Sequence, residues 1–545
     1  MDDELDKLVD EFVQWWVERN PIAGTVLGLH EYDHLLPDGS REAVLKEIEE
    51  EKGFLKRFEG LDPDKLSFQK QIERDAMVGL GRLSIFGMEE YRQWESRPFA
   101  VDILGASILR LYTMDFAPLK ERLLNIMSRI QKAPKFLEES KTRITKPVKL
   151  WVEIQIQSSK RFPVFLDEIY ETAKDVLEEA ELETLGKAIQ EMKEALSDYE
   201  KWMEEELLPR SEEEYRLGKE KLDKLIGLKR LGLSTGEIRA LGLDYLDRFK
   251  KVLEELAEVI KPGATVEEVR EQVKSNHPES FDQVMEEYRN SITESKKFIE
   301  ENKMVTIPPG EELKVVETPQ YLRNIIPFAA YLSPMKFDKK KIGIYLVTPV
   351  EEKSELMKKH SYAGIMNTSV HEGYPGHHLQ LTMCDLNPSI VPTLIHATET
   401  VEGWAHYCED WMKEKGFDDT PETRFIQTVD LVWRAVRIIV DIDLHSKIMD
   451  FDQAVDFLVE HVGLERPSAE AEVRRYTMHP AYQLCYLIGR HLITELRNEV
   501  KERMGDKWDE GFFHNTFLSA GSLPVFLIRQ IFDNKLKEMG FPPQG

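Results

Sequence analysis

Apolar residues recur every three or four positions along most of residues 1–310, the spacing that places them on one face of an α-helix. The first predicted helix runs from Asp2 to Val17 and ends near Asn20 and Pro21. Further helix breaks are expected at Gly60 to Pro63, Pro118, Pro134 and Pro147. Two capping boxes, Ser234 with Glu237 and Thr265 with Glu268, predict helix starts. The pattern therefore predicts a long series of helices.

The pattern changes after Lys303, where two short runs are typical of β-strands, residues 313–316 and 341–349. We therefore expect a helical domain over residues 1–303 and a second region over 304–545, the two forming one continuous body. Within the second run, Ile342 to Val347 is a candidate edge strand that could take an extended peptide as an additional strand. An ordinary edge hairpin is the alternative.

Charge and cysteine content narrow the class of protein. The chain has 100 acidic and 73 basic residues and a net charge of -27, which argues against a nucleic acid or an anionic membrane as its main partner. The N-terminus is acidic where a signal peptide would be basic, and no apolar run reaches the roughly 18 residues of a membrane span. The three cysteines make no disulfide framework and are expected in the core. A soluble cytoplasmic protein is predicted, whereas its oligomeric state is not.

The stretch from His371 to Gln380, HEGYPGHHLQ, carries the candidate chemistry. Zincins place two histidines one helical turn apart, as HExxH, so that both bind one zinc ion while the glutamate activates water. Here the next histidines come six and seven positions after His371, which a regular helix would not bring to the same ion.

Removing Pro375 and Gly376 from the count restores the zincin spacing. Proline cannot donate the helical hydrogen bond and glycine accepts unusual backbone angles, so we expect an interrupted helix that returns His377 to His371. Glu372 would then be the general base. The alternatives are His378 as the ligand, or a histidine-rich turn that holds no ion.

A zinc ion held by two histidines needs a third protein ligand and an open fourth position. The segment from His396 to Trp411 supplies two candidates, of which Glu402 is preferred and Glu399 is the alternative. His406 follows Glu402 by four residues on the same helical face, and we expect it to support the ligands from behind. Either glutamate could instead be ordinary surface charge.

Two stripes of polar residues run along otherwise apolar helices further on. Arg434, Arg437, Asp441 and His445 recur at three and four positions within a helix predicted near Arg424 to Met449. Buried charges must be paired or functional, so this stripe faces a polar cavity or forms an internal ion-pair network. Asp441 and His445 are assigned to the shell that supports the metal ligands.

The second stripe consists of Tyr476, His479, Gln483, Tyr486 and Arg490. A peptidase needs a donor for the developing oxyanion, and Tyr486 is the first candidate and His479 the second. Arg437 or Arg490 could bind a substrate carboxylate through two parallel hydrogen bonds. A tyrosine-rich core helix with satisfied hydroxyls is the alternative.

At this point the chain resembles the family called domain of unknown function 885, commonly grouped with zinc metallopeptidases. The resemblance extends nearly from end to end. It is carried by NPIAGTVLGLHEYD (20–33), EYRLGKEKL (214–222), VTIPPGEELKVVETPQYLR (305–323), NTSVHEGYPGHHLQ (367–380), EGWAHY (402–407), WRAVRIIVDIDLH (433–445), YQLCYLIG (482–489) and FHNTFLSAGSLP (513–524).

The resemblance implies a mainly helical, elongated body with a deep cleft, similar to the angiotensin-converting-enzyme and thimet-oligopeptidase group, with the 1–303 domain as one wall of the cleft. It also implies one Zn²⁺ ion at His371, His377 and a downstream glutamate. We expect a metallopeptidase acting on short or unfolded peptides, with the arginines favouring a carboxypeptidase. The alternatives are a metal-dependent amidase or esterase on a non-peptide substrate, and a non-catalytic protein stabilised by zinc.

Overall fold

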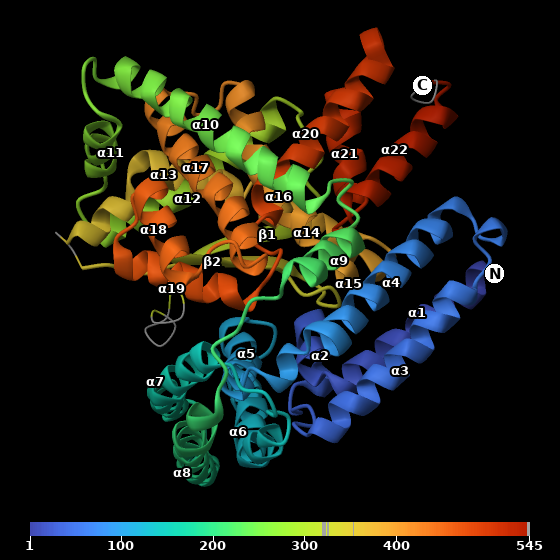
Figure 1. Cartoon of the computed structure of the whole chain (residues 1–545), viewed down its shortest axis with the longest axis vertical. Helices are drawn as coiled ribbons and strands as arrows, with labels where there is room; N and C mark the ends of the chain where they lie inside the picture. The colour runs from blue at the N-terminus through green and yellow to red at the C-terminus, as the bar shows by residue number, and fades with distance from the viewer. Residues whose placement is uncertain (319–322, 324–325, 327, 352–353, 542–545) are drawn as a thin grey trace. The chain divides into compact units, whose positions relative to one another are not determined.

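Helices form most of the chain and a small β-sheet interrupts them, which confirms the predicted mainly helical class (Figure 1). The computed structural model describes residues 1–318, 323, 326, 328–351 and 354–541. Two compact units are present, Met1–Tyr215 with Met335–Lys339, and Arg216–Pro334 with Lys340–Gly545. Residues 216–303, which the sequence pattern grouped with the N-terminal helices, therefore belong to the unit that carries the histidine motif.

The first unit consists of helices, and all of the predicted breaks in it except Pro134 lie between helices. One helix ends at Gly60 and another begins directly after Pro118, whereas Pro134 lies inside a helix that continues past it. The bounds are α1 (Asp2–Arg19), α2 (Pro21–Leu27), α3 (Arg41–Gly60), α4 (Phe68–Phe86), α5 (Ala100–Thr113), α6 (Leu119–Lys141), α7 (Lys149–Ala173) and α8 (Glu179–Trp202).

A histidine in this unit lies between two carboxylates. His30 Nδ1 is 2.9 Å from Asp33 Oδ2, and its Nε2 is 3.0 Å from Asp338 Oδ1. The hydrogen bonds to Asp33 and Asp338 raise the pKa of His30 from 6.5 to about 9, against the opposing effect of burial. The charged imidazolium therefore ties the segment Met335–Lys339 to the loop after α2.

We expect this contact to make stability depend on pH. Because the folded pKa of His30 exceeds its unfolded value of 6.5, its stabilisation is complete below pH 6.5 and is lost as the pH rises through about 9. The urea midpoint of His30→Gln should therefore fall below that of the wild type at acidic pH and converge with it above pH 9. His34→Gln, at an exposed position, is the control, and an equal deficit at all pH values would contradict the assignment.

The second unit holds the remaining helices, and its core is the set around α16 and α17. Ser234 and Thr265 form the two predicted capping boxes. The bounds are α9 (Lys219–Lys229), α10 (Thr235–Ile260), α11 (Val266–Ser275), α12 (Phe281–Glu301), α13 (Tyr362–Glu372), α14 (His377–Leu386), α15 (Val391–Ile395), α16 (Thr398–Glu414), α17 (Pro421–His445), α18 (Phe451–Val462), α19 (Arg466–Met478), α20 (Cys485–Met504), α21 (Glu510–Ser519) and α22 (Val525–Glu538).

The sheet has three strands in the order β1 (Glu311–Glu317), β3 (Lys341–Val347), β2 (Ala329–Leu332). β1 pairs with β3 in parallel, and β2 pairs with β3 in antiparallel. The expectation that residues 342–347 form an edge strand is therefore wrong, because β3 is hydrogen-bonded on both sides. Its run of buried residues from Gly343 to Val347 is typical of a central strand.

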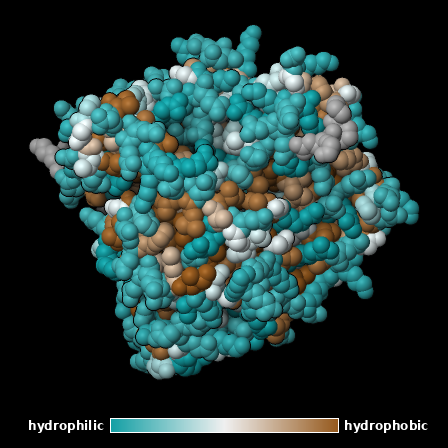
Figure 2. Space-filling model, turned by 45° about the horizontal axis from the view of Figure 1, so that its top comes forward, coloured by the Kyte–Doolittle hydropathy of each residue, from teal (hydrophilic) through white to brown (hydrophobic). Residues whose placement is uncertain are grey.

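Hydrophilic side chains cover most of the face seen in Figure 2, which agrees with a chain of 32% charged residues. The three cysteines, Cys384, Cys408 and Cys485, are free and buried, as predicted. Among the described helices, none has both the length and the apolar character needed to cross a membrane.

Candidate metal centre

The histidine motif interrupts a helix, as the sequence predicts. α13 ends at Glu372 and α14 begins at His377, with a cis peptide bond between Tyr374 and Pro375. Gly376 lies so close to the end of α13 that an added Cβ would be 1.9 Å from the carbonyl oxygen of His371. The tight break brings the imidazole rings of His371 and His377 to a centroid distance of 4.7 Å.

Glu402 on α16 completes a group of three potential ligands. The nearest ligand atoms of His371, His377 and Glu402 all lie within 4.8 Å of one another. Glu402 Oε2 is 3.9 Å from His371 Nε2 and 3.5 Å from His377 Nε2, both too long for good hydrogen bonds. Zinc ligands at about 2.0–2.2 Å in tetrahedral geometry lie roughly 3.4 Å apart. The donor set and its spacing therefore fit one zinc ion.

The neighbouring histidines strongly shift the pKa of Glu402 in this group. Burial raises the pKa of the Glu402 carboxyl, but its contact with His377 and the charges of His371 and His406 lower it overall to about 2. His377 Nδ1 is buried and has no hydrogen-bond partner among the described residues. A buried polar atom without a hydrogen-bond partner costs free energy of folding. Packing alone therefore does not explain why a histidine stands at this position.

The two alternative ligands face elsewhere. His378 Nε2 lies 2.5 Å from Glu311 Oε2, and its Nδ1 lies 3.0 Å from the hydroxyl of Tyr331. Glu399 is paired with Lys229 at 3.6 Å. Neither residue belongs to a ligand group found in the described part of the chain. His377 and Glu402 are therefore grouped with His371, whereas His378 and Glu399 are not, and the ligand assignment stays a prediction.

Glu311 of β1 contacts residues on both sides of the helix break. Its carboxylate receives hydrogen bonds from the Tyr374 hydroxyl and from Lys296 Nζ, in addition to its contact with His378. Burial raises the pKa of Glu311, but these three contacts lower it overall to about 2. One buried carboxylate thus holds residues on both sides of Pro375.

Sequence reasoning missed Glu409, which lies behind His371. Its Oε1 is 2.8 Å from His371 Nδ1 and 3.0 Å from His406 Nδ1, and Asn367 donates to its Oε2. A carboxylate at Nδ1 holds the proton there and leaves Nε2 as the ligand atom, as in carboxylate–histidine–zinc arrangements. Glu409 follows Glu402 by seven residues, so both lie on one face of α16, and this spacing could have revealed it.

A second group of possible ligands, His371, His406 and Glu409, shares His371 with the first. Glu409 Oε1 already lies within 3.0 Å of both His371 Nδ1 and His406 Nδ1, and Arg434 Nε donates to His406 Nε2 at 3.3 Å. Burial lowers the pKa of His406 to about 4, so this imidazole is neutral near pH 7. His406 Nδ1 is nevertheless buried without a hydrogen bond to any described residue. The imidazole ring of His406 lies beside that of His371, at a centroid distance of 4.8 Å, and its predicted supporting role stays a prediction.

Replacing Glu409 by glutamine should weaken zinc binding by about 10- to 100-fold, because His371 loses the carboxylate that fixes its proton. Competition with a chromophoric chelator measures this affinity. Glu414→Gln is the matched control, since Glu414 lies on the same helix with a half-exposed side chain. Equal affinities in the two variants would contradict the role given to Glu409.

The candidate base, Glu372, is the last residue of α13, beside His371. Burial lowers the pKa of His371, but the hydrogen bond to Glu409 and the charges of Glu372, Glu409 and Glu402 raise it overall to about 9. Glu372 also adds to the raised pKa of buried Tyr288 and Tyr345. Its carboxylate is thus close enough to influence the cluster but is not itself one of the grouped ligands.

Tyr486 of α20 lies near the same cluster. Its ring centroid is 5.9 Å from that of His406. Burial and the charge of Glu402 raise the pKa of Tyr486 to about 12, so the hydroxyl keeps its proton. Tyr482, which the sequence left unassigned, lies at a centroid distance of 5.9 Å from Tyr486, and the charge of Glu402 contributes to its raised pKa. The negative charge of Glu402 therefore raises the pKa of both tyrosine hydroxyls.

Two glycines allow α16 and α20 to touch through their backbones. A Cβ on Gly489 would lie 1.9 Å from the carbonyl oxygen of Glu399, and one on Gly403 would lie 2.3 Å from the carbonyl carbon of Gly489. Side chains at this crossing would force the helices apart. The contact places Glu402, beside Gly403, close to Tyr486, one turn before Gly489.

The two arginines predicted to bind substrate have partners inside the chain. Arg437 Nε donates to the Tyr476 hydroxyl at 3.0 Å, and its guanidinium lies 4.9 Å from the Tyr486 ring centroid. Arg490 forms an ion pair with Asp410. The stripe on α17 therefore forms an internal network at Arg437 and packs against Tyr486, which was the alternative interpretation.

The remaining predicted residues lie around the turn that precedes α20. Asp441 accepts hydrogen bonds from the backbone N–H groups of Ala481 and Gln483, each at 2.9 Å. His445 Nε2 is 3.1 Å from the carbonyl oxygen of Tyr476. His479 stands at the end of α19 with an exposed side chain, its ring 6.2 Å from that of Tyr482. Asp441 thus holds the turn that carries Tyr482, and His445 contacts the backbone of α19; neither is grouped with the histidine ligands.

The fold and the site together define a mainly helical protein with two histidines and a glutamate gathered at a helix break. The chain belongs to the family described as "Bacterial protein of unknown function (DUF885)", whose model matches residues 21–531. This membership confirms the family resemblance predicted from the sequence motifs. No curated protein matches the chain.

Two solved structures share the fold over nearly the whole chain. One, described as a "putative lipoprotein of unknown function" from Shewanella oneidensis, has a TM-score of 0.80 and 22% identity and covers 97% of this chain and 99% of its own. The other, a "putative lipoprotein" from Colwellia psychrerythraea, has a TM-score of 0.86 and 20% identity, with coverage of 98% and 99%. At these identities the likeness concerns the fold alone.

Proposed function

We propose that this protein is a zinc-dependent metallopeptidase that hydrolyses short or unfolded peptides. The observation that carries the proposal is the grouping of His371, His377 and Glu402, with the buried carboxylate of Glu409 at Nδ1 of His371. Two histidines and one glutamate form the ligand set of several catalytic zinc sites, which leave a fourth position open. Structural zinc sites more often recruit cysteines, and the three cysteines here lie outside both ligand groups.

The side chains around the ligands have roles that fit peptide hydrolysis. A zinc ion, when bound, polarises a carbonyl group and lowers the pKa of water. Glu372 is the proposed general base, which takes the proton of the attacking water and returns it to the leaving amine. The protonated hydroxyl of Tyr486 donates a hydrogen bond to the developing oxyanion, and Tyr482 is the second candidate for that role. His479 is less suited, because its side chain is exposed at the end of α19.

The position of cleavage is a separate part of the proposal. A carboxypeptidase needs a cation for the C-terminal carboxylate of its substrate, and the two arginines considered for this role are engaged with Glu472, Tyr476 and Asp410. The geometry therefore supports peptide hydrolysis more strongly than it supports removal of C-terminal residues. The products of a mixed peptide library would distinguish single-residue removal from internal cuts.

Metal analysis combined with digestion of that library tests the function. We expect about one zinc per chain in the wild type, cleavage that a chelator abolishes and zinc restores, and loss of both metal and cleavage in His377→Gln. His378→Gln should retain the metal, because its imidazole is bonded to Glu311 and Tyr331. Loss of metal in His378→Gln but not in His377→Gln would overturn the ligand assignment.

The same experiment separates the alternative functions. Bound zinc without cleavage of any peptide would favour a zinc-stabilised binding protein. Chelator-sensitive hydrolysis of amides or esters, with intact peptides, would favour an amidase or esterase. Cleavage that persists after complete removal of the metal would exclude the proposed mechanism.

A further inference from the structure

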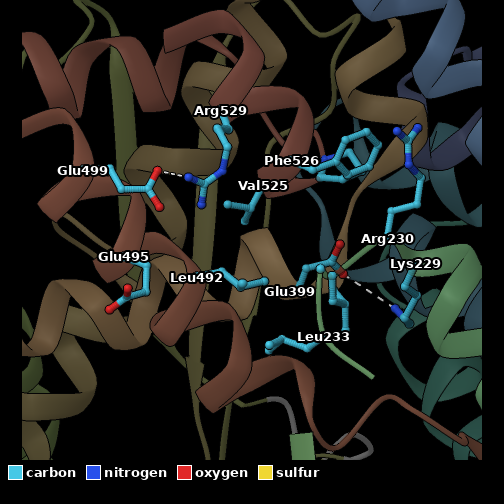
Figure 3. Close-up of a pocket in the computed structure, with 13 residues that line it drawn as sticks. Lys229, Arg230, Leu233, Glu399, Leu492, Glu495, Glu499, Val525, Phe526 and Arg529 are labelled. Carbon is cyan, nitrogen blue, oxygen red and sulfur yellow. Dashed lines mark ion pairs between the residues drawn. The ribbon is translucent and has the colours of Figure 1, made fainter. Parts of the chain in front are cut away.

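A cavity of about 360 Å³ lies in the second unit, and none of the proposed metal ligands lines it. Its walls come from the end of α9 and the following loop, the first turn of α16, one face of α20 and the start of α22 (Figure 3). The volume lies at the lower end of the range for small-molecule sites, about 300–1,000 Å³. It suits a small metabolite and not a protein segment.

The cavity has one carboxylate among its apolar residues and further charged groups at its sides. Figure 3 shows Glu399 among Leu233, Leu492, Val525 and Phe526. Lys229 and Arg230 stand on one side, and the Glu499–Arg529 ion pair stands on the other. The guanidinium of Arg230 lies 3.9 Å from the ring centroid of Phe526. A ligand would therefore meet an apolar surface with opposite charges at its edge.

Glu399 is the unusual member of the cavity. Its side chain is only 5% exposed, and its nearest cation, Lys229 Nζ, is 3.6 Å away, beyond the length of a normal hydrogen bond. A buried carboxylate is costly unless it is closely paired and hydrogen-bonded. The pair is thus held apart at the wall of an open space, where a polar group from a ligand could reach both partners.

We propose that the cavity binds a free α-amino acid with an apolar side chain. Glu399 attracts a cationic group and Lys229, 3.6 Å away, attracts an anionic group, so a ligand that carries both charges close together complements the pair. The α-ammonium group would bond to Glu399, the α-carboxylate to Lys229 and Arg230, and the side chain would pack on Leu233, Leu492, Val525 and Phe526. An amino acid has these three groups on one carbon atom.

In a peptidase, a site for a free amino acid could bind a product of the reaction. Free amino acids are the product if the enzyme removes terminal residues, and the cavity would then respond to product accumulation. That consequence rests on the proposed function, whereas the binding itself does not. Because Glu399 precedes the proposed ligand Glu402 by one helical turn, the two sites must be separated experimentally.

Isothermal titration of the full-length protein with L-leucine and L-phenylalanine tests the proposal. We expect saturable binding that weakens at least about tenfold for N-acetyl-leucine, which lacks the ammonium group, and for leucinamide, which lacks the carboxylate. Glu399→Gln and Lys229→Met should weaken L-leucine binding by a similar factor. Glu502→Gln and Lys251→Met, at exposed positions, are the matched controls, and circular dichroism verifies the fold of each variant.

A titration of His377→Gln distinguishes the cavity from the metal centre. Binding that persists in this variant and is lost in Glu399→Gln and Lys229→Met supports the cavity, even if the protein proves to have no peptidase activity. Three results would overturn the proposal: no binding of either amino acid, binding of the two blocked analogues as tight as that of L-leucine, or binding lost in His377→Gln and unchanged in both cavity variants.

Discussion

Glu372→Gln should reduce peptide hydrolysis by about 10²- to 10⁴-fold, the usual contribution of a general base. Glutamine occupies nearly the same volume but cannot accept the proton of the attacking water. Because Glu372 is not one of the grouped ligands, zinc content and thermal stability should stay close to those of the wild type. The measurement is kcat on a peptide identified from the library, with zinc content determined on the same sample.

An exposed glutamate provides the control for this substitution. Glu355 has an 85% exposed side chain, and Glu355→Gln should retain full activity. If Glu372→Gln cleaves peptides as fast as Glu355→Gln, the base lies elsewhere and the proposed mechanism fails. If it loses zinc together with activity, Glu372 belongs to the ligand set instead.

Gly376→Ala should cause the largest loss of stability at the site, at least about 3 kcal/mol of unfolding free energy. The added methyl group would lie 1.9 Å from the carbonyl oxygen of His371 and 2.4 Å from that of Val370. Both atoms belong to the backbone, so no side-chain movement relieves the clash. The break would have to open, which separates His371 from His377, and zinc affinity should fall together with stability.

Gly227→Ala is the matched control, because Gly227 lies within α9 and a Cβ there meets nothing within 4 Å. Alanine at such a position should stabilise the helix by about 0.5–1 kcal/mol. Urea denaturation and chelator competition measure the two quantities. A Gly376→Ala protein that unfolds at the wild-type midpoint and binds zinc normally would contradict the described geometry of the break.

Local chemistry explains what the sequence predicted correctly. The helix break follows from a proline without a donor and a glycine without a Cβ, both visible in the motif itself. The preference for Glu402 came from the helical spacing to His406; both residues lie near His371, and the role of Glu402 as a ligand stays a prediction. Glu409 was equally accessible through the same helical face, but the interpretation of that face stopped at His406, three residues before it.

Features that depend on partners distant in the sequence were harder to predict. The central position of β3 depends on β2, which has only four residues and a weak pattern. The partners of Arg437 and Arg490 come from α19 and α16, and spacing along one helix cannot reveal them. A polar stripe on a buried helix therefore predicts pairing reliably but not the identity of the partner. The expected deep cleft and cytoplasmic location stay predictions.

The contact between Gly403 and Gly489 limits how this protein can change during evolution. Because the backbones of α16 and α20 meet there, neither glycine can gain a side chain unless the helices separate. Separation would increase the distance between Glu402 and Tyr486, one a proposed ligand and the other a proposed oxyanion donor. Substitutions that leave every polar group intact could thus abolish function through helix spacing alone.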